Sequence, residues 1–94
     1  MNDRTIFLDY CFKVCDKLVQ SVNGKVTFEA YVEIDVVIFI IEFKDFVFKH
    51  GVNRVTDLIY KGDSDSVVAD IKKAYRAELL RTFFKDNKRR GVWN

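Results

Sequence analysis

The chain has 94 residues, a formal net charge of +2 and an apolar fraction of 49%, and it contains nine Phe. This length suits one domain, and so apolar a chain is expected to fold around an aromatic core rather than stay disordered. No apolar run reaches the ~18 residues of a membrane span, and the first residues lack the pattern of a signal peptide. We therefore expect a single domain over residues 1–94 without a membrane anchor.

Residues 4–21 are predicted to form the first helix, because apolar side chains recur on one side at helical spacing. Cys11 and Cys15 lie four residues apart on this helix, where a disulfide would be strained, so we expect free thiols and a cytoplasmic setting. Together with His50 they form an incomplete candidate zinc site. Because cysteine is among the most buried residue types, core packing is the preferred interpretation, and no metal or cofactor is predicted.

Two strands are expected next. Residues 25–35 alternate between apolar and polar side chains, which predicts a strand with one wet face. Residues 36–41 carry no polar side chain, which predicts a strand buried on both faces. Turn chemistry does not place the reversal between them. A tight turn near Ile34 and Asp35 fits, and so does one long strand that reverses at Lys44 and Asp45, where the apolar pattern changes phase.

The segment 54–61 fits either a short helix capped by Asn53 or an edge strand, and the edge strand is preferred. A loop over residues 62–66 leads to the second helix, expected over residues 66–85, and a basic tail follows over residues 86–94. The predicted fold is α+β: a small, largely antiparallel sheet of three or four strands with two helices packed on one face, in the order α-β-β-β-α.

The apolar side of the second helix is not constant along its length. Its first half places its apolar residues on one side, and its second half places four others well over ~100° away around the axis. We expect the helix either to kink near Glu78 or to continue past the domain and offer the second set to a partner or to another copy, as a homodimer. That set is Leu79, Leu80, Phe83 and Phe84.

Charge is distributed unevenly along the chain. Residues 1–60 hold seven Lys or Arg against nine Asp or Glu, whereas residues 61–94 hold nine against five. The predicted element order resembles that of double-stranded RNA-binding domains, which place basic residues at the start of the last helix. Here that start is acidic, so binding to RNA or DNA is an alternative function. It would use the later cations Lys72, Lys73, Arg76, Lys88, Arg89 and Arg90.

The motif Glu42-Phe43-Lys44 follows an apolar strand and resembles half of the PD-(D/E)xK nuclease motif. The resemblance implies that Glu42 and Asp35 hold Mg²⁺ and that Lys44 organises the attacking water. On one strand, however, an odd spacing of seven places Asp35 and Glu42 on opposite faces. No Ser or Cys is linked to His50 by spacing, and no glycine-rich phosphate loop is present. A nuclease is therefore an alternative, and the preferred prediction is a protein that is not an enzyme.

The segment from Leu58 to Tyr75 resembles the C-terminal half of small phage-encoded helix–three-strand–helix proteins, among them anti-CRISPR inhibitors. This resemblance implies a non-enzymatic accessory protein of a phage or mobile element. Such a protein would act in the bacterial cytoplasm by binding and inhibiting a host protein or nucleoprotein machine. The residues expected to contact the partner are acidic side chains and the displaced apolar set: Glu29, Glu33, Asp35, Asp63, Asp65, Leu79, Leu80, Phe83 and Phe84.

Overall fold

The computed structural model describes residues 3–61 and 63–89. The elements follow in the order α1 (Asp3–Val19), β1 (Lys25–Tyr31), a single 3₁₀ turn η1 (Val32–Ile34), β2 (Val36–Phe43), β3 (Phe46–Asn53), α2 (Val55–Lys61) and α3 (Ser64–Arg89). The strands form one antiparallel sheet in the order β1-β2-β3. The predicted α+β class and the three-stranded form of the sheet are confirmed, with a third, short helix added to the two that were expected.

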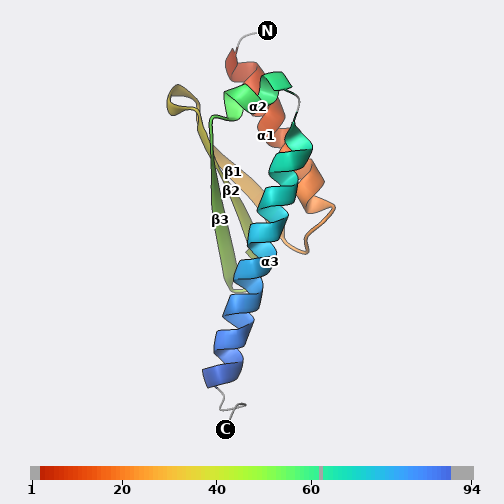
Figure 1. The fold of residues 1–94 in the computed structure, drawn as a ribbon, viewed down its shortest axis with the longest axis vertical. Coiled ribbons are helices and arrows are strands. Elements are labelled where there is room, and N and C mark those ends of the chain that lie inside the picture. Colours follow the sequence, from red (N-terminus) through yellow and green to blue (C-terminus); the bar gives the residue numbers. More distant parts are fainter. Residues whose placement is uncertain (1–2, 62, 90–94) are drawn as a thin grey trace.

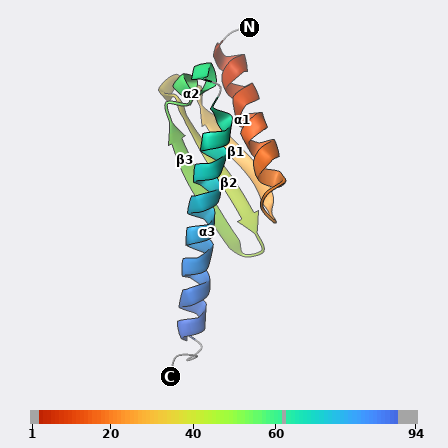
Figure 2. The same ribbon diagram turned by 45° about the vertical axis from the view of Figure 1, so that its right-hand side comes forward.

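The helices and the sheet form two layers. Figures 1 and 2 show α1 and α3 on the same side of the sheet, with α2 near the upper end of the strands. The core between the layers contains Phe7, Val14 and Leu18 from α1, with Phe39 and Ile41 from β2. Each of these five side chains is at most 1% exposed. Packing is therefore dense on one side of the sheet.

Both reversals proposed from the sequence occur. The chain leaves β1 through η1 and turns into β2 at Asp35, whose φ of 55° lies in the left-handed region. It then leaves β2 through a two-residue turn at Lys44 and Asp45, with Lys44 at a φ of 54°. Neither turn contains Gly or Asn, which are the usual residues at positive φ. The turn chemistry was therefore not readable from composition.

The expected edge strand over residues 54–61 is wrong, since the structure has helix α2 there. Asp35, and not Asn53, supplies the cap: its Oδ1 accepts a hydrogen bond from the Thr56 backbone N–H at 3.0 Å and another from the Thr56 hydroxyl. Val55 is fully buried and Leu58 and Ile59 pack on the core, so the helix places its apolar residues at helical spacing. A side chain 21 residues earlier in the chain thus decides the structure of this segment.

The second long helix, α3, is continuous from Ser64 to Arg89, so the expected kink near Glu78 does not occur. Figure 1 shows its C-terminal part running beyond the end of the sheet, as the other alternative required. It continues past the predicted end at residue 85 into the segment expected to be a tail. Leu79 packs against the core, whereas Leu80 is 68% exposed. The side chains of Phe83 and Phe84 lie outside the described residues.

Candidate protein-binding surface

The sheet has one face without helices. Strand register places cross-strand partners on the same face, and Phe39 and Ile41 are in the core, so alternate residues point the other way. This opposite side, which we name the open face, carries Lys25, Thr27, Glu29 and Tyr31 from β1, Val36, Ile38, Ile40 and Glu42 from β2, and Val47, Lys49, Gly51 and Asn53 from β3.

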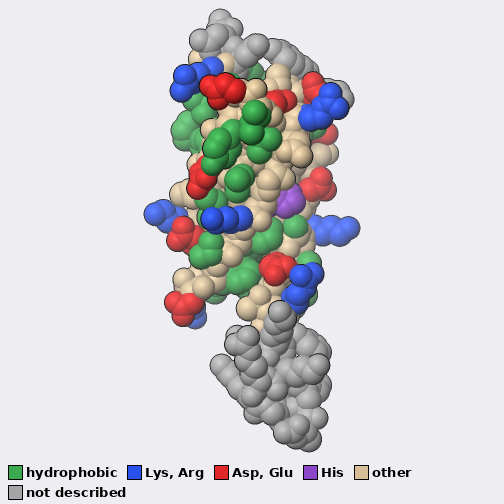
Figure 3. All heavy atoms as spheres, turned by 90° about the vertical axis from the view of Figure 1, so that its left-hand side faces the viewer, with side chains coloured by type: hydrophobic (Ala, Val, Ile, Leu, Met, Phe, Trp, Pro, Cys, Tyr) green, Lys and Arg blue, Asp and Glu red, His purple; other side chains and the backbone are tan. Residues whose placement is uncertain are grey.

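The centre of the open face is apolar. Val36 and Ile38 on β2 are half-buried by their neighbours, Ile40 is 9% exposed, and Val47 beside them is 54% exposed. Figure 3 looks onto this side and shows hydrophobic side chains running along it between acidic and basic ones. The prediction that β2 is buried on both faces therefore holds only in part: none of residues 36–41 is exposed, but helices cover only one side of the sheet, and Val36 and Ile38 on the other side are only half-buried.

Charged residues lie around this apolar centre on both outer strands. Glu29 on β1 accepts a hydrogen bond from the Tyr31 hydroxyl at 2.9 Å, which raises the pKa of Tyr31 above its ordinary value. Lys49 lies on β3, on the other side of Ile38 and Ile40, and forms no ion pair among the described residues. Lys25 and Glu42 are cross-strand partners at the end of the sheet near the β2–β3 turn. The face thus has an apolar middle and a charged margin of both signs.

The acidic residues predicted to bind a partner do not form one patch. Only Glu29 belongs to the open face, while Glu33 is exposed in η1. The carboxylate of Asp35 is occupied by Thr56, and Asp63 is half-buried between α2 and α3. Asp65 forms a 2.6 Å ion pair with Lys17 of α1, whose Nζ also donates to the Ser64 hydroxyl at 2.9 Å. Asp35 and Asp65 therefore hold elements of the fold together.

The structure does not assemble the nuclease motif. Asp35 precedes β2 and Glu42 is near its other end, so at ~3.3 Å per residue the two lie about 23 Å apart along the strand. Lys44 is in the β2–β3 turn, and its Nζ lies 5.5 Å from the centre of the Phe43 ring. The carboxylates that the resemblance assigns to one Mg²⁺ are thus at opposite ends of the sheet.

The cysteines and His50 are also not arranged as a metal site. Burial is the main cause that raises the pKa of the Cys11 thiol to about 12 and that of the Cys15 thiol to about 11, so both stay protonated at neutral pH. His50 stacks on Phe48 with 6.1 Å between ring centres. Within residues 3–61 and 63–89, no cluster of three His, Cys, Asp or Glu side chains suits a metal ion.

The cations named for nucleic-acid binding lie on α3. Lys73 and Arg76 are exposed and Lys72 is half-buried, while the side chains of Lys88 and Arg89 and all of Arg90 lie outside the described residues. Arg76 borders a groove with a volume of about 250 Å³ at the foot of the domain, lined by Ser21, Val22, Asn23, Phe43, Tyr75, Arg76 and Leu79.

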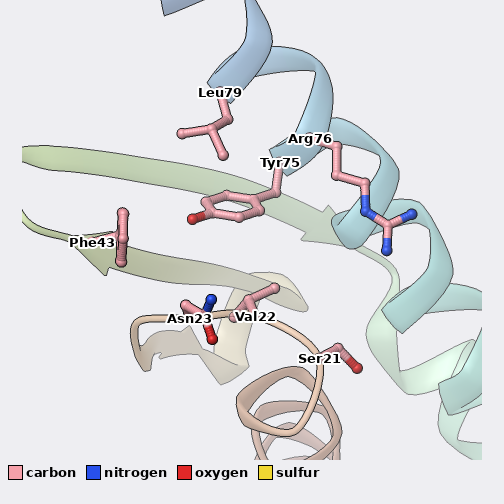
Figure 4. A pocket seen from close by; sticks show the side chains of 7 residues that line it. All are labelled: Ser21, Val22, Asn23, Phe43, Tyr75, Arg76 and Leu79. Carbon is pink, nitrogen blue, oxygen red and sulfur yellow. The ribbon is translucent and has the colours of Figure 1, made fainter. Parts of the chain in front are cut away.

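Figure 4 shows the Tyr75 ring extending from α3 towards Phe43, with the Arg76 guanidinium turned the other way. Tyr75 is part of the core, where its ring lies 5.6 Å from Phe48 and 6.0 Å from Phe46. Leu79 forms part of the same wall, whereas Leu80, the other described side chain of the apolar set predicted on α3, is exposed to solvent. The groove therefore lies where the loop after α1, the end of β2 and α3 pack together, and Arg76 is the cation at its edge.

Sequence reasoning missed the residues that define the open face: Val36, Ile38, Ile40 and Val47. In the uniformly apolar run from Val36 to Ile41 no polar residue indicates which side lacks a cover. The available signal was the count of elements, because two helices on one side of a sheet leave its other side uncovered.

No helix in the described part of the chain is both long enough and apolar enough to cross a bilayer. No family model matches this chain, and neither the curated proteins nor the solved structures include a match.

Proposed function

We propose that this chain is a non-catalytic interaction protein that binds a host protein or nucleoprotein machine through the open face of its sheet. The observation that carries the proposal is the apolar column Val36, Ile38 and Ile40, which faces away from every described helix. The resemblance of residues 58–75 to phage-encoded inhibitors supports the class of partner: an inhibitor of a bacterial machine, acting in the cytoplasm.

The physical reason is the cost of apolar surface in contact with water. Burying apolar area gains roughly 25 cal/mol per Å², and contiguous exposed apolar patches on small proteins commonly mark contact sites. Protein interfaces combine an apolar centre with a polar and charged rim. The open face has this composition, with Ile38 and Ile40 in the middle and Glu29 and Lys49 at its sides.

The apolar set on α3 supports a second contact. Leu80 is 68% exposed and lies on the part of α3 that runs towards the end of the molecule, whereas Leu79 is already packed. A single exposed leucine offers less area than a strand face, so we assign the main contact to the sheet. A homodimer through Leu79, Leu80, Phe83 and Phe84 is the alternative proposal for this part of α3.

Two matched variants test this assignment. Val47 lies on the open face and is 54% exposed, and Val19 lies on α1 and is 53% exposed. The change of each to Asp introduces the same charge at the same degree of exposure in a different layer of the molecule. Wild-type, Val47→Asp and Val19→Asp chains would be used to capture proteins from nuclease-treated bacterial lysate, and the captured target would then be purified and titrated against all three.

We expect Val47→Asp to weaken binding of the purified target at least tenfold and Val19→Asp to leave it unchanged, because only the former places a charge in the apolar contact. Equal binding by both variants, or loss in Val19→Asp alone, would contradict the assignment. Capture that disappears on nuclease treatment and weakens steeply with salt would instead favour the nucleic-acid alternative on α3.

A further inference from the structure

Strand β3 is one of the two outer strands of the sheet (Figure 2), and little on it blocks a further strand. The register of β2 and β3 runs one residue against one over all eight pairs, so this edge contains no bulge. The eight residues of β3 include one Lys and no Pro, Arg, Asp or Glu. Natural proteins commonly protect edge strands with charges, prolines or bulges, because an unpaired edge accepts other strands. The β3 edge has almost none of this protection.

The free backbone groups on this edge belong to alternate residues. Phe43 and Phe46 flank a two-residue turn, so they exchange both backbone hydrogen bonds, and hydrogen-bonded pairs then recur at every second position. The backbone N–H and C=O groups of Val47, Lys49 and Gly51 therefore point away from β2. None of these groups has a hydrogen-bond partner among the described residues. The edge thus presents unpaired donors and acceptors at the spacing of a β-ladder.

The other edge of the sheet carries more charge. On β1, Lys25 and Glu29 have opposite signs, and the Glu29 carboxylate already accepts the Tyr31 hydroxyl. Helix α1 packs against the same strand, with 5.1 Å between the ring centres of Phe12 and Phe28. Strand β3 is therefore the edge more open to a further strand.

The side chains along β3 specify what an added strand carries. Lys49 and Gly51 both lie on the open face, and Lys49 forms no ion pair among the described residues. A Cβ atom placed on Gly51 would meet no atom within 4 Å, so a large side chain of the added strand has space there. An aromatic residue opposite an edge glycine covers the bare backbone, and opposite charges attract across strands. In an antiparallel strand, the residue opposite Gly51 comes two positions before the residue opposite Lys49.

We propose that the partner protein adds an extended segment antiparallel to β3, with an aromatic residue opposite Gly51 and, two positions later, an Asp or Glu opposite Lys49. The inference rests on the proposed function, because it assigns to the same partner the strand edge that borders the open face. The added strand forms backbone hydrogen bonds with Val47, Lys49 and Gly51 and lengthens the sheet by one strand. Main-chain bonds supply the affinity, and the spacing of the aromatic and acidic residues supplies the selectivity.

Two synthetic peptides test the charge preference on the full chain. The probe is acetyl-Thr-Thr-Trp-Val-Glu-Val-Thr-Thr-amide, and the control peptide has Lys in place of Glu. We expect the probe to bind with a Kd of about 1 mM or tighter and the control at least threefold more weakly, because its Lys meets Lys49. In Lys49→Glu the order of the two peptides should reverse. Absence of probe binding, or equal binding of the two peptides to wild type, overturns the inference.

Two substitutions at Gly51 test the backbone bonds separately from the side chains. Gly51→Pro removes an N–H that β2 does not use, which an edge strand tolerates, whereas Gly51→Ala keeps it. We expect Gly51→Pro to weaken binding of the probe at least tenfold and Gly51→Ala at most threefold, with far-UV circular dichroism spectra like that of wild type. Equal weakening by the two variants contradicts the backbone pairing.

Amide hydrogen exchange of the wild-type chain tests the same bonds without a variant. In the free chain, the N–H groups of Phe48 and His50 bond to β2 and should exchange slowly, while those of Lys49 and Gly51 should exchange fast. The bound probe should slow exchange at Lys49 and Gly51. Saturation with probe that leaves both amides in fast exchange rules out an added strand.

The same exchange measurement separates this inference from the proposed function. A captured target that binds Val47→Asp weakly, but leaves Lys49 and Gly51 in fast exchange, covers the open face without pairing with β3. The inference then fails and the proposed function stands. If the probe protects both amides while Val47→Asp and Val19→Asp bind the captured target equally, the assignment to the open face fails and the pairing with β3 stands.

Discussion

Three residues with positive φ lie at the turns between elements of this domain. Asp35, Lys44 and Arg54 all have φ between 54° and 58°, in the left-handed region that non-glycine residues enter only with some strain. Asp35 tolerates this best, because aspartate can form local hydrogen bonds there. Its backbone C=O also accepts the Arg54 N–H at 2.9 Å, so one residue links the start of β2 to the start of α2.

Replacing Asp35 should separate its two roles. Asp35→Ala removes the acceptor of the Thr56 N–H and adds a left-handed alanine, so we expect a loss of about 1–2 kcal/mol in the free energy of unfolding. Asp35→Asn keeps a side-chain oxygen and tolerates positive φ, so it should retain most of that stability. Urea denaturation of the two variants measures the difference, and equal stability of both would contradict the capping role.

Gly24 allows the loop after α1 to approach the end of β2. A Cβ atom at this position would lie 2.6 Å from the Glu42 carbonyl oxygen, which is backbone and cannot rotate away. We expect Gly24→Ala to lower the free energy of unfolding by about 1–3 kcal/mol. Gly51→Ala is the matched control, since its Cβ meets open space. In urea denaturation it should leave the free energy of unfolding unchanged or raise it slightly. A larger loss of unfolding free energy in Gly51→Ala than in Gly24→Ala would contradict the close approach of Gly24 to Glu42.

Some elements of this fold follow from the local sequence pattern, whereas others depend on tertiary contacts. The alternation Val26, Phe28 and Ala30 in β1 marks the helix-covered side, and these side chains do pack on the core. The phase change between Phe43 and Phe46 likewise predicted either a bulge or a two-residue turn, and the structure contains the turn. In both cases the residues that determine the local structure are neighbours in the sequence, so the pattern could be recognised without the fold.

Two other elements could not be predicted in this way. Helix α2 depends on a cap from Asp35, which local propensity does not include, so the sequence alone favoured an edge strand over the helix that the structure contains. The helix-free side of β2 could not be predicted, because all residues from 36 to 41 are apolar. Val36, Ile38 and Ile40 therefore look no different in the sequence from the alternate residues that face the core. The main candidate site was therefore inferred only once the layers of the fold were known. The apolar set on α3 was predicted from the sequence, and of its two described side chains Leu80 is exposed and Leu79 is packed.

The contact between α1 and α3 should depend on pH through Lys17 and Asp65. The hydrogen bond from Lys17, and then its charge, lowers the pKa of Asp65 in the folded state, so the pair stabilises the fold above the unfolded pKa of Asp, about 3.9. That contribution is lost as the pH falls through the lowered folded pKa.

We therefore expect wild-type thermal stability to fall more steeply below about pH 4 than that of Asp65→Asn. Asp70→Asn, a change at another exposed position on α3, should follow wild type. Thermal melts across this range measure the comparison. Parallel curves for wild type and Asp65→Asn would show that the ion pair does not couple to folding.

The whole molecule consists of two layers, one of helices and one sheet. Helices α1 and α3 cover one side of the sheet, and α3 continues past it, so the protein is 59 Å long but only 24 Å and 20 Å across. A broad apolar strand in the middle of a half-covered sheet is costly for an isolated monomer and useful for a binding module. This architecture is the main support for a function based on contact.

The central claim is that the open face is the surface that other proteins cover. The most direct test is a methyl NMR titration of isoleucine-labelled protein with its binding partner, whether a captured target or a further addition of the same chain. We expect the methyl signals of Ile38 and Ile40 to shift with partner concentration while those of the core residues Ile41 and Ile71 stay fixed. Saturated binding that leaves Ile38 and Ile40 unmoved would contradict the account.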